Sequence, residues 1–286
     1  MTRLIKKNIV LLSILTTIFS PICLAEELNK SADKEKDTWY ALTAENDAVT
    51  LGDNSDDGYT NGVAWSWGYD PKDSFAEVDM PNWIRKISEW TYLNDSNNHS
   101  FSINYVVAQG MFTPDDLTQE EVIEDDRPYA GTLTWSTRIY SFDNQIANSL
   151  GLTLGVVGPA SLAEQAQTGI HKLIDATEPQ GWDNQLSNEP VFRIDAAHVR
   201  RLFDYDLSNS LQFDTNSYSE AGVGNLRSDI GTGLSIRIGN RLSESFAYIN
   251  PAPARGINNT LGSHLQSFNW HLAIAAYGSY VFNDIT

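Results

Sequence analysis

The sequence predicts an all-β fold, an antiparallel β-barrel of the outer-membrane type with a short helix in one of its outer loops. The first observation is a period of two. From 59 to 69 the odd positions carry bulky residues and the even positions carry tiny or polar ones. The same alternation recurs in 101–108, 133–139, 150–156 and 226–238. Alternation of this kind is typical of strands that have one apolar and one polar face.

A soluble β-sandwich gives the same alternation, but two further observations favour a membrane barrel. The predicted strands are mostly about 10 to 14 residues long, enough for a tilted strand to cross lipid, and Trp and Tyr crowd their ends as at membrane interfaces. The face opposite the apolar one also carries charges among its Gly and Ser residues, which suits a polar lumen. These charged residues are Arg193, Asp195, Arg227, Asp229 and Arg237.

The first 25 residues predict a secretory signal peptide, with a basic start, an apolar middle and a small-residue exit at Ala25. Cleavage there leaves a linker, 26–37, before the barrel, 38–286. After the signal, no segment has 18 consecutive apolar residues, the length that a spanning helix requires.

The alternation predicts nine strands and, with the N-terminus in the periplasm, four outer connections. A short helix is expected at Pro81–Leu93, within the long periplasmic connection 70–99. A second helix is expected in the outer connection 158–188, where Ser161 and Glu164 form a capping box. The strands are 38–46, 58–69, 100–111, 130–141, 148–157, 189–202, 206–216, 225–239 and 267–282, and the outer connections are 47–57, 112–129, 158–188 and 217–224.

Nine is an odd number, whereas bacterial single-chain barrels have an even number of strands. By parity the last strand ends at the outer rim without a strand to close the barrel. We therefore expect the chain to be incomplete at its C-terminus. The alternative is a strand overlooked within 240–266.

Composition and missing motifs exclude several classes of protein. The chain has 37 Asp and Glu against 19 Lys and Arg, a formal charge of −18, which argues against a nucleic-acid partner. A single cysteine, Cys23, excludes a disulfide scaffold and paired-Cys zinc sites. The G-x-S-x-G, H-E-x-x-H, P-loop and G-x-G-x-x-G motifs are absent, so a serine nucleophile is not indicated. No protein partner is implied.

Two features could carry chemistry. Of the five histidines, His171 alone falls in a predicted structured element on the outer side, although a surface or packing role is the commoner reading of a helix histidine. The acidic segment 45–57 could bind calcium, which prefers several oxygen ligands, or could be a solvated turn. An EF-hand is rejected because its twelfth position would be Ala64 rather than a glutamate.

Five motifs in order along the chain resemble the LpxR-like lipid A deacylases, and the resemblance runs from about residue 38 to about 282. The motifs are Glu45-Asn46-Asp47, Asp57-Gly58-Tyr59-Thr60-Asn61-Gly62, Asp126-Arg127-Pro128-Tyr129-Ala130-Gly131, Gly158-Pro159 followed by His171, and Gly181-Trp182-Asp183-Asn184-Gln185-Leu186 with Asn188-Glu189-Pro190.

The resemblance implies a twelve-stranded outer-membrane barrel that uses calcium to hydrolyse an acyl ester of lipid A, the anchor of lipopolysaccharide, with its site facing the outer leaflet. The family has an acidic residue about six positions after the catalytic histidine. Here that position holds Thr177, with Asp175 and Glu178 on either side. The residues that match the family's site are Asn46, Asp47, Thr60 and His171.

These residues suggest a mechanism without a protein nucleophile. His171 would take a proton from water, Asp175 or Glu178 would orient its ring, and a calcium ion held partly by Asp47 would polarise the carbonyl. The other two matched residues would complete the oxyanion contacts or the metal shell. An outer-membrane phospholipase, or a non-catalytic pore or adhesin, is the alternative.

Overall fold

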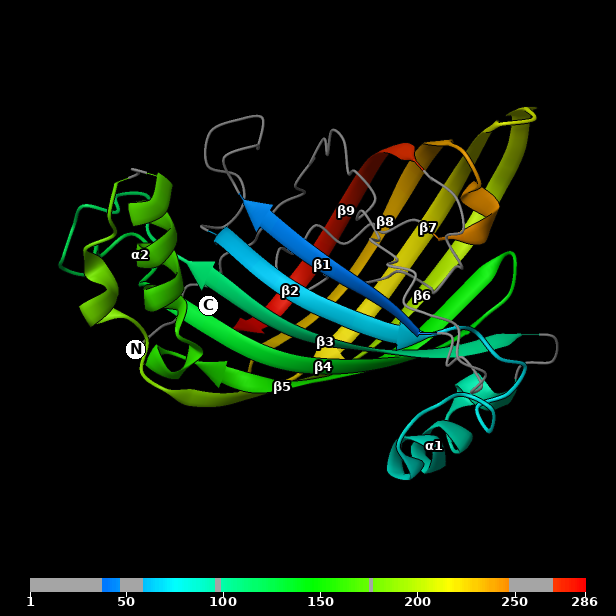
Figure 1. The fold of residues 1–286 in the computed structure, drawn as a ribbon, viewed down its shortest axis with the longest axis horizontal. Coiled ribbons are helices and arrows are strands. Elements are labelled where there is room, and N and C mark those ends of the chain that lie inside the picture. The colour runs from blue at the N-terminus through cyan, green and yellow to red at the C-terminus, as the bar shows by residue number, and fades with distance from the viewer. Residues whose placement is uncertain (1–37, 47–58, 96–98, 175–176, 247–269) are drawn as a thin grey trace, which may run out of the picture.

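The computed structural model describes residues 38–46, 59–95, 99–174, 177–246 and 270–286, and most of them form one antiparallel sheet (Figure 1). Its order is β1 to β9, each strand pairing with the next, which confirms the all-β prediction. The strands are β1 (Thr38–Asn46), β2 (Tyr59–Tyr69), β3 (Ser100–Phe112), β4 (Ala130–Phe142), β5 (Ile146–Val157), β6 (Glu189–Ser208), β7 (Leu211–Val223), β8 (Arg227–Gly239) and β9 (His271–Asp284).

Helices occur in the connections between strands. α1 (Asn82–Glu89) and the 3-10 turn η2 (Tyr92–Asp95) lie between β2 and β3. α2 (Ala163–Ile174) lies between β5 and β6, flanked by η3 (Pro159–Ser161) and η4 (Gly181–Asn184), and η5 (Leu242–Glu244) follows β8. Both predicted helices are thus confirmed. None of the described helices is long and apolar enough to cross a membrane.

In the part of the chain that the structure describes, β1 and β9 are the two edges of the sheet. The predicted signal peptide, the linker and most of 240–266 lie outside the described residues. The incomplete C-terminus therefore stays a prediction.

The prediction was wrong about the bounds of β6 and β7, because β6 runs on to a tight turn at Asn209 and Ser210 and β7 begins only after that turn and continues to Val223. The register shifts between Arg201 and Phe203, so that the alternation of faces changes phase there. A strict period of two breaks at such a bulge, which is why the pattern indicated an end to the strand. The predicted outer connection 217–224 shrinks accordingly to a short turn.

The connections fall at two opposite ends of the sheet, which we call the α2 end and the α1 end. β1 finishes and β2 begins at the α2 end, where the connections β3–β4, β5–β6 and β7–β8 also lie (Figure 1). The long connection between β2 and β3 lies at the α1 end (Figure 1). This division agrees with the parity count made from the sequence.

The two faces of the sheet differ in burial and in chemistry. The outer face exposes large apolar side chains from most strands, an arrangement suited to contact with lipid. Examples are Leu42, Trp65, Leu154, Ile194, Ile230, Leu234, Ile236 and Ile274. The inner face instead buries charged and polar side chains, among them most of the residues that the sequence predicted for a polar lumen.

Buried charges on the inner face form a continuous series, which we call the inner ion-pair chain. Two of its pairs join strands that are separated by one other strand, whereas Arg227 pairs within β8 and with the neighbouring β9. The pairs are Arg138 of β4 with Asp195 of β6 (2.5 Å), Arg193 of β6 with Asp229 of β8 (2.7 Å), and Arg227 of β8 with Asp229 (2.6 Å) and with Asp284 of β9 (3.1 Å).

Small residues make these long-range pairs possible. Gly151 of β5 lies in register between Arg138 and Asp195. A Cβ atom on Gly151 would come within 2.7 Å of Arg138 Nη2 and 2.9 Å of Asp195 Oδ1. Gly222 of β7 leaves room in the same way for the guanidinium of Arg193. The small residues on the inner face therefore leave the space that the ion pairs occupy.

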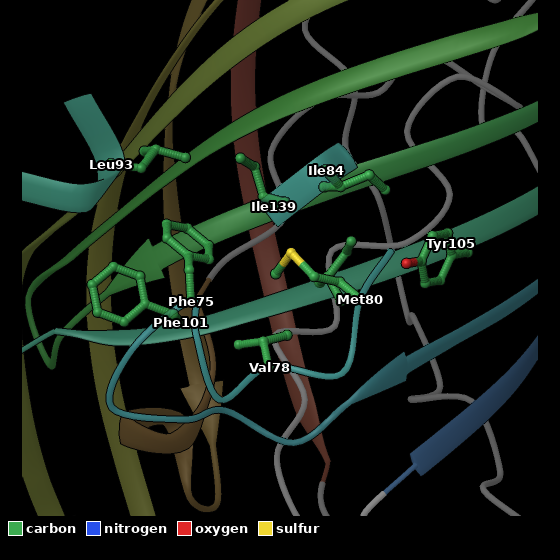
Figure 2. Close-up of a cluster of buried hydrophobic side chains, with 9 residues drawn as sticks. Phe75, Val78, Met80, Ile84, Leu93, Phe101, Tyr105 and Ile139 are labelled. Carbon is green, nitrogen blue, oxygen red and sulfur yellow. The ribbon is translucent and has the colours of Figure 1, made fainter. Parts of the chain in front are cut away.

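At the α1 end, the connection between β2 and β3 folds back onto the outer face of β3 and β4 (Figure 2). Backbone hydrogen bonds between Lys72 and Phe101 attach it to β3 at 2.9 and 2.7 Å. The residues in the resulting apolar cluster are Phe75, Val78, Met80, Ile84 and Leu93 of the connection with Phe101, Ile103, Tyr105 and Ile139 of the sheet.

We predict that Asp195→Ala destabilises the fold by about 3 kcal/mol, because it leaves the partly buried Arg138 without its charge partner. Urea unfolding of the protein in phospholipid vesicles measures this free energy. Asp204→Ala, on an exposed part of β6, is the matched control and should change the stability little. Equal stability of the two variants would contradict a structural role for the inner ion-pair chain.

Candidate functional site

α2 is fixed to the α2 ends of β3 and β4 by side-chain packing. Met111 of β3 and Ala163 of α2 belong to one buried cluster with Tyr129 and Trp182. Gln109 of β3 donates its side-chain amide to the carbonyl of Ser161, just before the helix, at 2.6 Å. The helix therefore has a defined position over the end of the sheet.

The two large connections at the α2 end also hold each other. Trp182 donates its indole N–H to Gln167 Oε1 of α2 at 2.8 Å, and its ring lies 5.0 Å from that of Tyr129. Burial raises the pKa of the Tyr129 phenol. The backbone N–H of Gln180 donates to the carbonyl of Leu117 at 2.9 Å. Residues 113–129 and 158–188 thus form one packed unit, which supports α2.

Several of the motif residues build this support rather than a reaction centre. Gly158 has a φ of 102°, a conformation that suits glycine, where the chain leaves β5. Asn188 accepts a hydrogen bond from the N–H of Ala160 at 2.7 Å. A Cβ on Gly131 would collide with Ser161, and one on Gly181 would collide with the ring of Tyr129.

His171 lies on α2, partly exposed, one turn beyond the buried Gln167. Its Nδ1 is hydrogen-bonded to the backbone carbonyl oxygen of Thr177. Because a carbonyl oxygen can only accept, Nδ1 carries the hydrogen, and in the neutral ring Nε2 keeps a lone pair. The geometry thus leaves Nε2 able to take a proton.

The two carboxylates predicted near His171 have different surroundings. Glu178 is exposed, and its carboxylate pairs with Lys172 at 3.6 Å. Asp175 lies outside the described residues. The contact to His171 comes instead from the Thr177 carbonyl, which side-chain motifs could not reveal because any residue can supply a carbonyl.

The backbone places Asn46 and Thr60 at the same end of the sheet as α2. Asn46 ends β1 and pairs with Asn61 of β2. Thr60 is the extra residue of a bulge against β3, and the next residue, Asn61, pairs with Met111, which packs against α2. Bulges are common beside active sites, where they redirect a side chain.

The metal prediction falls mainly outside the described residues. Asp47 and the acidic residues up to Asp57 lie there. Within the described ranges, no group of three His, Cys, Asp or Glu side chains could hold a metal ion. The donors offered by Asn46, Asp47 and Thr60 are all oxygens, the ligand type that calcium takes.

Beside His171, α2 exposes apolar side chains. The helix predicted in 158–188 has Ile170 and Leu173 among its apolar residues. Both are exposed, Leu173 to 85%, while Ala163 and Gln167 form the buried face. Gln167 can be buried because its side chain accepts the indole N–H of Trp182. An apolar surface is therefore left open next to the histidine.

Comparison with known proteins agrees with this architecture. The comparison with curated proteins gives no match. Among solved structures, "LpxR from Salmonella typhimurium" has the same fold, with a TM-score of 0.64 and 18% sequence identity over 86% of this chain and 78% of that chain. The model of the family "Outer membrane protein LpxR" matches residues 10–286. The chain therefore belongs to the LpxR family of outer membrane proteins.

Proposed function

We propose that this protein is a lipid A deacylase, which hydrolyses an ester-linked acyl chain of lipopolysaccharide in the outer membrane. Membership of the LpxR family implies this activity and this substrate. The observation that carries the proposal is the state of His171. Its Nδ1 is tied to the Thr177 carbonyl, so that Nε2 is available as a base.

Hydrolysis can proceed without a protein nucleophile. Nε2 of His171 accepts a proton from a water molecule as the water oxygen bonds to the ester carbonyl carbon. When the tetrahedral intermediate collapses, the bond to the sugar oxygen breaks and the imidazolium returns the proton to that oxygen. The Thr177 carbonyl accepts the Nδ1–H throughout and stabilises the positively charged ring.

The negative charge that develops on the carbonyl oxygen needs a partner. Asn46 and Thr60 are the proposed donors or metal-shell residues, and both sit at the α2 end of neighbouring strands. We propose Asp47 as a ligand of calcium, which when bound supplies a positive charge for the oxyanion and for the phosphates of lipid A. This second effect matters because the chain carries a formal charge of −18.

The apolar surface of α2 gives the site its lipid preference. Ile170 and Leu173 would contact the acyl chains while His171 faces the ester bond. The α2 end of the barrel would then face the outer leaflet, where lipid A resides. A phospholipase could use the same residues, so purified protein should be offered lipid A and phospholipid separately. If fatty acid were released from phospholipid but not from lipid A, the substrate would be phospholipid instead of lipid A.

We predict that His171→Ala lowers the rate of fatty acid release from lipid A by about 10²- to 10⁴-fold, the usual contribution of a general base. The fold should persist because the side chain is partly exposed. His198→Ala is the matched control, since His198 lies within β6 and bonds to Asn148 at 2.7 Å. If His171→Ala kept the wild-type rate, α2 would contribute no residue to catalysis.

Asp175→Asn and Glu178→Gln separate the two candidate carboxylates. We expect the larger loss of rate from Asp175→Asn, because Glu178 already pairs with Lys172. The rate measured against lipid A over a pH range decides between them. Unchanged rates and pH profiles in both variants would leave the Thr177 carbonyl as the sole partner of the ring.

We also predict that chelation of divalent ions abolishes hydrolysis. Calcium should restore it better than magnesium at the same concentration, because calcium tolerates the irregular oxygen coordination that a loop provides. The release of fatty acid is measured before and after each addition. Full activity in excess chelator would contradict the role of the metal. The role of His171 is tested separately by the His171→Ala variant.

A further inference from the structure

α1 carries an apolar stripe that the rest of the described chain leaves uncovered. Trp83 and Ile87 of α1 and Trp90 at its C-cap follow one another at the spacing i, i+4 and i+7 and so share one side of the helix. They are exposed to 50%, 55% and 91%, respectively. Three adjacent large apolar side chains on one helix, exposed to this degree, indicate a surface that meets something other than water.

The other side of α1 is fixed to the sheet. Ile84 is buried in the apolar cluster on the outer face of β3 and β4 (Figure 2). Arg85 donates a hydrogen bond from Nη2 to the carbonyl of Val78 at 3.0 Å, and Ser88 is also buried. The stripe is therefore presented from a helix whose orientation on the outer wall is set.

The stripe continues a surface that is suited to contact with lipid. The cluster beneath α1 covers part of the outer face of the sheet, whose remaining apolar side chains are exposed. Phe203 and Tyr205, where β6 nears its end, are also strongly exposed and lie at the α1 end. Aromatic side chains at one end of a membrane barrel mark the boundary between lipid and water.

We propose that α1 is an interfacial anchor, whose stripe of Trp83, Ile87 and Trp90 inserts into the phospholipid surface at the α1 end of the barrel. Lys86, exposed beside the stripe, would lie at the level of the lipid phosphates. With the α2 end at the outer leaflet, as proposed above, this surface is the periplasmic leaflet. The anchor would fix how deeply the barrel is inserted in the membrane. It would thereby set the height of α2 above the opposite membrane surface.

The anchor is tested by site-directed spin labelling of the full chain in vesicles of phosphatidylethanolamine and phosphatidylglycerol. A nitroxide is attached at Ile87→Cys or Trp90→Cys, in a Cys23→Ser background that leaves one thiol. Collisions with oxygen, which concentrates in lipid, are compared with collisions with a water-soluble nickel complex. Glu89→Cys is the matched control, because Glu89 is exposed on the same helix but lies off the stripe.

We expect the ratio of oxygen to nickel collisions to be several-fold higher at both stripe positions than at Glu89→Cys. A ratio typical of water at both stripe positions would overturn the proposal. Protection of both positions from both reagents would also overturn it, because the stripe would then be covered by protein, such as a second copy of the chain. Hydrolysis of lipid A by the same labelled samples reports separately on the proposed activity.

Discussion

The inner ion-pair chain is the constraint on which the rest of the structure depends. Charges buried on the inner face are stable only when each has a partner, and in two of the pairs the partners sit on strands separated by one intervening strand. Arg138 reaches across Gly151 to Asp195, so β4 and β6 must curve toward each other. The curvature turns the apolar side chains outward and brings the connections at the α2 end together. α2 is held at the end of this wall by the packing of Met111 against Ala163.

The fold was predictable from the sequence where the alternation is strict and less so where it breaks. Eight of the nine predicted strands begin within a few residues of the observed ones, because inner and outer faces demand different residues at every second position. β6 ran longer than predicted because of the bulge beside Arg201, and β7 therefore began later. The connection before β3 packs over Phe101 and Ile103, which was also not predictable. A surface that contacts lipid and a surface that is covered by protein carry the same apolar side chains.

The residues of the candidate site were proposed from the sequence, but their contacts could not be predicted from it. The motifs located His171 on a helix, and the strand order explains why Asn46 and Thr60 reach the same end of the sheet. The partner of His171 was missed because it is the backbone carbonyl of Thr177, which leaves no trace in a sequence. The bonds from Trp182 to Gln167 and from Gln109 to Ser161 were missed because they join residues distant along the chain.

The central claim is that a water molecule activated on α2 removes an acyl chain from lipid A. Mass spectrometry of lipid A extracted from bacterial cells with and without the protein tests it most directly. We expect lipid A from cells containing the protein to be lighter by the mass of one fatty acyl group, with its phosphates retained. Identical lipid A in both kinds of cell, while the protein is folded in their outer membrane, would contradict it.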